Sequence, residues 1–138
     1  MVNSRNKGAA FERHSCNFLN DLLEKRGHER SVKRNLDQYQ TKGLADLYFK
    51  NFAIECKRYK ARKDNWPITK WWEQAVSAAG DKYIPILIYK FDRKPIYVVV
   101  PAWLVSSTPK NNQITYMCPL EEVCQKITKV LGKSNVSR

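Results

Sequence analysis

Apolar residues recur at helical spacing near the start of the chain, over residues 7–26. Five of them fall on one face of such a helix: Phe11, Phe18, Leu19, Leu22 and Leu23. Gly27 follows directly, and glycine commonly takes the position after the last turn of a helix. The pattern predicts a long amphipathic helix that buries this face.

Shorter apolar runs follow this helix, and they predict the strands of a sheet. The predicted strands lie within residues 28–37, 44–49, 52–57, 83–89 and 96–100. Lys50-Asn51 separates the second run from the third by the length of a tight turn, so these two runs form a β-hairpin. The last two runs are rich in Ile, Val and Tyr, which is typical of central strands covered on both faces.

Residues 67–79 predict a second helix, with Trp71 on its apolar face and Gly80 at its end. After a core of about residues 5–100, the extension 101–138 is expected to be irregular at first, with one short edge strand within 113–117. A last helix then begins, with Pro119 in its first turn. The order of helix, strands, helix, strands and helix predicts one mixed α/β domain whose sheet is flanked by helices.

The composition of the chain indicates a class of binding partner. The 138 residues contain 25 Lys and Arg against 13 Asp and Glu, a net charge of +12, and 43% of them are hydrophobic. Such a charge on one small domain favours a polyanion, with nucleic acid as the first candidate and an anionic membrane surface as the second. A solvated basic face without a partner is the third interpretation. The positive charges cluster at residues 26–34 and 57–63, which favours a binding surface.

The sequence also argues against several classes of protein. It contains no apolar run of transmembrane length, and its first residues lack the apolar core of a signal peptide. The four cysteines form no CxxC pair, and they and the two histidines give no zinc spacing. We therefore expect free thiols and a cytoplasmic protein, in the host cytoplasm if a virus encodes it.

Three charged residues interrupt the apolar runs of the predicted hairpin: Asp46, Glu55 and Lys57. A charge inside a sheet is costly unless it is paired or binds a metal. Strand periodicity puts Glu55 and Lys57 on one face, and the hairpin brings Asp46 to the same end. The two carboxylates, with the backbone carbonyl of Cys56, would hold a hard cation, Mg²⁺ or in its place Mn²⁺. Lys57 would stabilise the attacking water or the charge that develops on a phosphate.

Two interpretations of these residues stay open at this point. One is metal-assisted hydrolysis of a phosphodiester, and the other is a buried ion pair that serves only the fold. The spacing D-x8-E-x-K is by itself a weak signal. Its context, in which a basic loop and a helix follow the hairpin, favours the nuclease.

The segment from Asp46 to Glu55-Cys56-Lys57 resembles the active site of the PD-(D/E)xK nuclease superfamily, with Ala45 in the place of the motif's proline. This resemblance implies a restriction-endonuclease-like fold with an αβββαβ core, to which a C-terminal helix is added. The helix after the E-x-K strand often carries a glutamine near the active site in that superfamily, and Gln74 matches it.

The N-terminal segment KGAAFER, residues 7–13, resembles the opening helix of archaeal-type Holliday junction resolvases. This resemblance implies that Glu12 belongs to the catalytic metal site. It also implies a homodimer that cuts four-way DNA junctions symmetrically during recombination and repair, leaving 5′-phosphates and 3′-hydroxyls.

Ten cations are the candidate contacts to nucleic acid: Arg5, Lys7, Arg30, Lys33, Arg34, Lys42, Arg58, Lys60, Arg62 and Lys63. Trp66 is a further candidate, for stacking on a base. Two alternative functions remain beside the resolvase. One is another nuclease of the superfamily that acts on duplexes, flaps or DNA ends in repair, replication or restriction. The other is a non-catalytic module that binds DNA or RNA.

Overall fold

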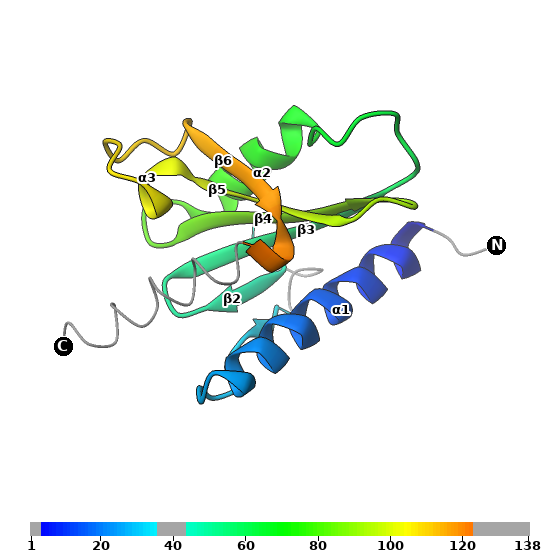
Figure 1. The fold of residues 1–138 in the computed structure, drawn as a ribbon, viewed down its shortest axis with the longest axis horizontal. Coiled ribbons are helices and arrows are strands. Elements are labelled where there is room, and N and C mark those ends of the chain that lie inside the picture. Colours follow the sequence, from blue (N-terminus) through cyan, green and yellow to red (C-terminus); the bar gives the residue numbers. More distant parts are fainter. Residues whose placement is uncertain (1–3, 36–43, 123–138) are drawn as a thin grey trace.

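The computed structural model describes residues 4–35 and 44–122, and its centre is a mixed six-stranded sheet in the order β1-β2-β3-β4-β5-β6 (Figure 1). The strands are β1 Lys33–Arg34, β2 Leu47–Phe49, β3 Phe52–Tyr59, β4 Ile84–Phe91, β5 Ile96–Pro101 and β6 Thr115–Pro119. The helices are α1 Ser4–Lys25, α2 Thr69–Ala79 and the short α3 Ala102–Val105. The order α1-β1-β2-β3-α2-β4 is the αβββαβ core that the sequence predicts, so the fold class is confirmed.

The helices α1 and α2 cover opposite faces of this sheet (Figure 1). β3 and β4 are parallel, with Lys57 opposite Tyr89, because α2 crosses from the end of one strand to the start of the other. The other neighbouring strands pair antiparallel. Successive residues of β3 therefore point alternately toward α1 and toward α2.

The core forms on both faces. Phe11 and Leu23 of α1 pack with Ile54 and Ile88 on one face, and all four side chains are buried. On the other face, Trp71 of α2 packs in one cluster with the buried side chains Ala75, Leu87, Tyr89 and Phe91. The apolar faces predicted for the two helices are the faces that they bury.

The helix α1 ends as the sequence predicts. Gly27 takes a positive φ of 79°, and its N–H donates to the carbonyl of Glu24 over 3.1 Å. The N–H of His28 donates to the carbonyl of Leu23 over 2.9 Å. These two bonds form a Schellman motif, which satisfies the last carbonyls of the helix and turns the chain back along it.

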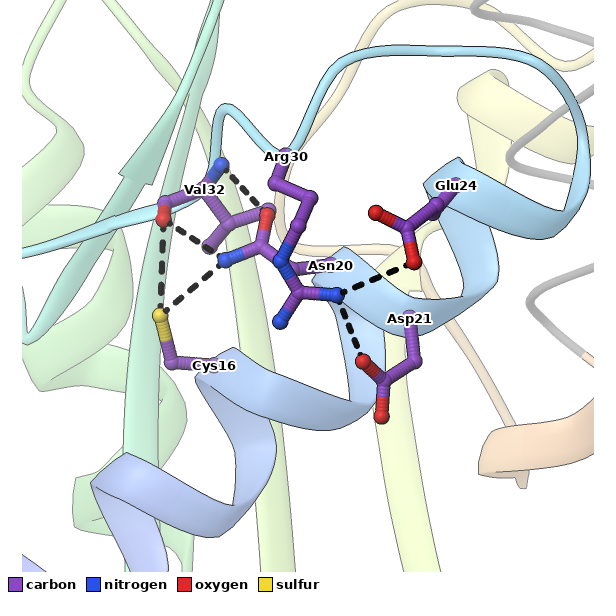
Figure 2. A network of polar contacts seen from close by, with 6 residues as sticks. All are labelled: Cys16, Asn20, Asp21, Glu24, Arg30 and Val32. Carbon is purple, nitrogen blue, oxygen red and sulfur yellow. Dashed lines mark hydrogen bonds and ion pairs between the residues drawn. The ribbon is translucent and has the colours of Figure 1, made fainter.

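The returning segment is attached to α1 by Asn20 (Figure 2). The side-chain amide of Asn20 donates from Nδ2 to the carbonyl of Val32 over 3.0 Å, and its Oδ1 accepts from the N–H of Val32 over 2.9 Å. The buried amide of Asn20 thus satisfies both backbone polar groups of Val32, just before β1, as a neighbouring strand would do. Arg30 binds the exposed carboxylate of Asp21 at 2.6 Å on the outside of the same turn.

The hairpin of β2 and β3 is also confirmed. Leu47 pairs with Ile54 and Phe49 with Phe52, so the turn consists of Lys50 and Asn51. Lys50 takes a positive φ of 50°, which a two-residue hairpin turn commonly requires.

The extension after residue 100 differs from the prediction in two places. The short helix α3 stands where irregular chain is expected, and Pro119 is the last residue of β6, opposite Tyr97, instead of the first turn of a helix. A proline fits there because β6 is a sheet edge, where the missing N–H costs no ladder bond. Residues 120–122 are helical, which confirms the start of the predicted last helix, whereas the rest of that helix lies outside the described residues, as does the segment 36–43, which includes the loop predicted over 38–43.

The described part of the chain contains no helix long and apolar enough to cross a membrane. Cys16, Cys56 and Cys118 are buried and carry thiols instead of disulfides, as expected, while Cys124 lies outside the described residues.

Candidate active site

The site is built where β2 begins and β3 continues past it. Asp46 directly precedes β2, and its Oδ2 accepts a hydrogen bond of 2.8 Å from the backbone N–H of Cys56. At this position the backbone N–H of β3 is satisfied by the side chain of Asp46, and not by the carbonyl of a neighbouring strand. Because the N–H and the C=O of one strand residue point to the same side, the carbonyl of Cys56 faces the edge that Asp46 occupies. This is the placement that a metal ligand from that carbonyl needs.

Glu55 and Lys57 point together toward α2. Both line an open hollow of about 560 Å³ beside that helix, and the Lys57 Nζ lies 3.9 Å from the Glu55 Oε2. Glu55 is buried, with 8% of its surface exposed, whereas Lys57 is half-buried. The hollow is lined by Leu44, Glu55, Lys57, Lys70, Glu73, Gln74, Ser77 and Ala78. The predicted glutamine Gln74 is therefore at the site.

Glu12 reaches the site from α1. It is buried in the third turn after Ser4, and its Oε2 lies 3.4 Å from a guanidinium nitrogen of Arg34 on β1. The charge of Glu12 also raises the pKa of Asp46, so the two carboxyl groups lie close together. The four residues Glu12, Asp46, Glu55 and Lys57 are therefore neighbours, although α1, β3 and the residue before β2 carry them.

The crowding of carboxyl groups changes their protonation. Burial, followed by the charge of Glu55 and that of Glu12, raises the pKa of Asp46 to about 8, and the N–H of Cys56 only partly opposes this. Burial and the charge of Glu12 also raise the pKa of Glu55 to about 7, against the effect of Lys57. Negative charge is thus costly here, and a bound cation would remove that cost.

The donor set fits a hard divalent ion by its chemistry, since it consists of carboxylate oxygens and one carbonyl oxygen. Within residues 4–35 and 44–122, however, no three His, Cys, Asp or Glu side chains stand arranged to hold an ion as they are. Asp46 and Glu55 both have raised pKa values, so binding of an ion requires that their carboxyl groups lose their protons.

The predicted DNA contacts near α1 are mostly engaged in ion pairs. Asp92, in the turn after β4, binds the Lys7 Nζ at 2.6 Å and a guanidinium nitrogen of Arg58 at 3.0 Å. The hydrogen bond from Lys7 lowers the pKa of Asp92. Burial and the charge of Arg58 lower the pKa of the neighbouring Lys90. Three cations thus surround one carboxylate.

The remaining predicted contacts are spread over other parts of the fold. Lys33 is exposed on β1, whereas Arg30 and Arg34 are paired with carboxylates. Lys60, Arg62 and Lys63 lie together in the loop after β3. The side chain of Arg5 and the whole of Lys42 lie outside the described residues.

Three contributions to the site were missed from the sequence. Lys70 lies four residues before Gln74, and helical spacing alone could have indicated that it shares the hollow. No local signal indicates that Arg34 pairs with Glu12 or that Asp92 joins Lys7 to Arg58, because these residues are far apart in the chain.

An αβββαβ core with Asp46 before the second strand and Glu55-Cys56-Lys57 on the third defines the class of PD-(D/E)xK nucleases. The chain belongs to the family of phage PD-(D/E)xK endonucleases: the family model described as "phage putative PDDEXK endonuclease" matches residues 3–133. The resemblance found in the sequence is thereby confirmed. Enzymes of this class generally use divalent metal ions.

A solved structure is similar to the chain: the Holliday junction resolvase Hjc from the archaeal hyperthermophile Archaeoglobus fulgidus. The identity is 19%, the match covers 83% of this chain and 98% of that one, and the TM-score is 0.40. A comparison with curated proteins found no match.

Proposed function

We propose that this protein is a Mg²⁺-dependent endonuclease that cuts four-way DNA junctions. The observation that carries the nuclease activity is the hydrogen bond from Cys56 to Asp46, since it holds Asp46 beside Glu55 and Lys57. The preference for a junction is supported by Glu12, which the KGAAFER segment predicted as a site residue and which lies beside Asp46.

The residues divide the work by charge. Asp46, Glu55, the Cys56 carbonyl and Glu12 would hold the ion, which when bound polarises the phosphodiester and lowers the pKa of a water. The Lys57 ammonium stabilises the negative charge that grows on the phosphate. Gln74 lines the same hollow, and its amide would orient the water.

The reaction is a hydrolysis. The oxygen of the water forms a bond to phosphorus, the bond from phosphorus to the 3′-oxygen breaks, and a proton passes to that oxygen. The products are a 5′-phosphate and a 3′-hydroxyl.

Two matching cuts on a four-way junction require two sites, which supports a homodimer with twofold symmetry as the working form. In a phage family, the place of action is the host cytoplasm, where the DNA is. Analytical ultracentrifugation with and without a junction tests the dimer: a monomer in both conditions contradicts it.

The experiment that tests the substrate compares labelled DNAs of matched sequence: a four-way junction, a linear duplex, a flap and a single strand. Each is incubated with the protein in Mg²⁺, in Mn²⁺ and in EDTA. We expect paired symmetric nicks in the junction with either metal and none in EDTA. Cutting of the duplex or flap in preference to the junction would assign another nuclease function. Binding without any cutting would assign the non-catalytic module.

A further inference from the structure

The loop over residues 60–68, between β3 and α2, carries a large apolar side chain that the fold leaves in solvent. Trp66 is 67% exposed, more than any other large hydrophobic residue of the described chain. An exposed indole forgoes the stabilisation that burial of so large an apolar surface provides. A single exposed apolar residue on a mobile loop would need no explanation. Whether Trp66 has a function therefore depends on how firmly its loop is held.

The loop is firmly attached directly before Trp66. Asn65 donates from Nδ2 to the Tyr97 hydroxyl over 3.0 Å, and the buried Tyr89 hydroxyl donates to the carbonyl of Asn65 over 2.6 Å. The N–H of Trp66 donates to Asp64 Oδ1 over 3.0 Å. Bonds to both polar groups of the Asn65–Trp66 peptide fix the backbone from which the indole projects.

The loop that carries Trp66 is basic. Lys60 and Lys63 are exposed, and Arg62 lies over the ring of Phe91 with 5.3 Å between its guanidinium carbon and the ring centroid. Asp64 lies 3.5 Å from Arg62 and is the acidic residue of this loop. Such a combination of cations and an aromatic face fits the backbone and a base of a nucleic acid.

The anchor of the loop lies within reach of the catalytic residues. Lys57, Tyr89 and Tyr97 are in register across β3, β4 and β5. Adjacent strands are about 4.8 Å apart, so the backbone of Tyr97 lies about 10 Å from that of Lys57. A strand whose phosphate is held at Lys57 can therefore extend across the sheet toward the anchored loop that carries Trp66.

We propose that Trp66 is a stacking platform for an unpaired base, or for one that has lost a stacking neighbour, in the DNA that this enzyme cuts. Inside a continuous duplex both faces of each base are covered, whereas a single strand, a fork or a branch point offers a free face. The platform thus selects branched DNA over duplex. This inference rests on the proposed nuclease function and adds to it the feature of DNA that is recognised.

The test measures binding by tryptophan fluorescence in EDTA, where no cutting occurs. The probes are a single strand, a forked DNA, a four-way junction and a long duplex with few ends. We expect the first three to quench the fluorescence and the duplex to leave it nearly unchanged. In Trp66→Phe the quenching should disappear, whereas the matched control Trp103→Phe, in α3, should retain it. Quenching that persists in Trp66→Phe overturns the proposal. Quenching by the duplex that equals the quenching by the other three DNAs also overturns it.

A second measurement locates the base. Trp66→Ala should weaken binding of the forked DNA about tenfold or more, with Trp66→Phe close to wild type, because base–aromatic stacking has that magnitude. An abasic nucleotide placed at successive positions should remove this penalty at one position only. Equal penalties at every position mean that Trp66 contacts no base, and no penalty at all means that the indole serves another partner, such as a protein; both results contradict the proposal.

The two proposals fail separately. Cleavage of a junction without quenching by any DNA leaves the nuclease and removes the platform. Quenching that depends on Trp66, in a protein that cuts no DNA in Mg²⁺ or Mn²⁺, leaves the platform and removes the nuclease.

Discussion

The backbone N–H of Cys56 donates a 2.8 Å hydrogen bond to the Oδ2 of Asp46. This bond holds the carboxylate of Asp46, which precedes β2, against the edge of β3, the strand that carries Glu55 and Lys57. Both strand neighbours of Cys56 point toward α2, so Asp46 lies at the edge between them. This contact explains the spacing of the PD-(D/E)xK motif: the β2–β3 hairpin brings Asp46 and Glu55 together, although they are separated in the sequence.

Removal of the Glu55 carboxylate should weaken metal binding. In Glu55→Gln the affinity for Mn²⁺, measured by calorimetry in the absence of DNA, should fall by more than about tenfold, because one anionic oxygen ligand is lost. The fold should persist, since the pKa of Glu55 is raised and a neutral amide replaces it without a new buried charge. The exposed Glu29→Gln serves as the matched control and should bind Mn²⁺ as the wild type does. Equal affinities in all three proteins would remove Glu55 from the ion site.

The metal-free protein should lose stability as the pH rises. In an unfolded chain these carboxyls ionise near pH 4, whereas the folded state keeps the protons of Asp46 and Glu55 up to about pH 8 and about pH 7. Between these limits the folded state binds more protons, so the free energy of unfolding falls with increasing pH. The Tm in EDTA should therefore fall from about pH 5 to about pH 8 more steeply in the wild type than in Asp46→Asn. Parallel curves for the two proteins contradict the raised pKa of Asp46.

The amide of Asn20 should be important for both folding and the site. Asn20→Ala leaves the N–H and the C=O of Val32 without their buried partner, which costs on the order of 1–3 kcal/mol of unfolding free energy. Asn17→Ala, at an exposed position of the same helix, should change stability by less than about 0.5 kcal/mol. Urea unfolding of the two variants measures the difference. Similar losses would show that the contact in Figure 2 does not hold β1 to α1.

Lys70 should contact a DNA phosphate, because it lines the same hollow as Glu55 and Lys57. Lys70→Ala should weaken binding several-fold for every DNA sequence and reduce the slope of log affinity against log salt by about 1. Lys82→Ala, which removes an exposed cation beyond the far end of α2, is the matched control. A slope that changes equally in both variants would mean that the hollow does not hold the DNA backbone.

The sequence predicts the residues of the site better than the contacts that arrange them. Asp46, Glu55 and Lys57 stand out because a charge within an apolar strand is rare, and period-two alternation then assigns their faces. Gln74 follows from the resemblance to the nuclease superfamily, whose helix after the E-x-K strand often carries a glutamine. These signals are local, and the β2–β3 hairpin that unites them closes over only two residues.

The contacts that could not be predicted join distant parts of the chain. Asn20 binds Val32, Arg34 pairs with Glu12, and Asp92 joins Lys7 to Arg58, over separations that no periodicity encodes. The exact boundary at Pro119 also depends on a distant contact. Proline suits both the start of a helix and the end of an edge strand, and the pairing of β6 with β5 extends the strand to Pro119, directly before the helical residues 120–122.

The most direct test of the account is the rate of junction cleavage in Mg²⁺ by the wild type, by Asp46→Asn and by Asp81→Asn. Asp81 is an exposed aspartate after α2, outside the site, and serves as the matched control. We predict that Asp46→Asn loses more than about 100-fold in rate while it still binds the junction, and that Asp81→Asn cuts as the wild type does. Cleavage by Asp46→Asn at the rate of the wild type would contradict the central claim that Asp46 and its neighbours form the catalytic site.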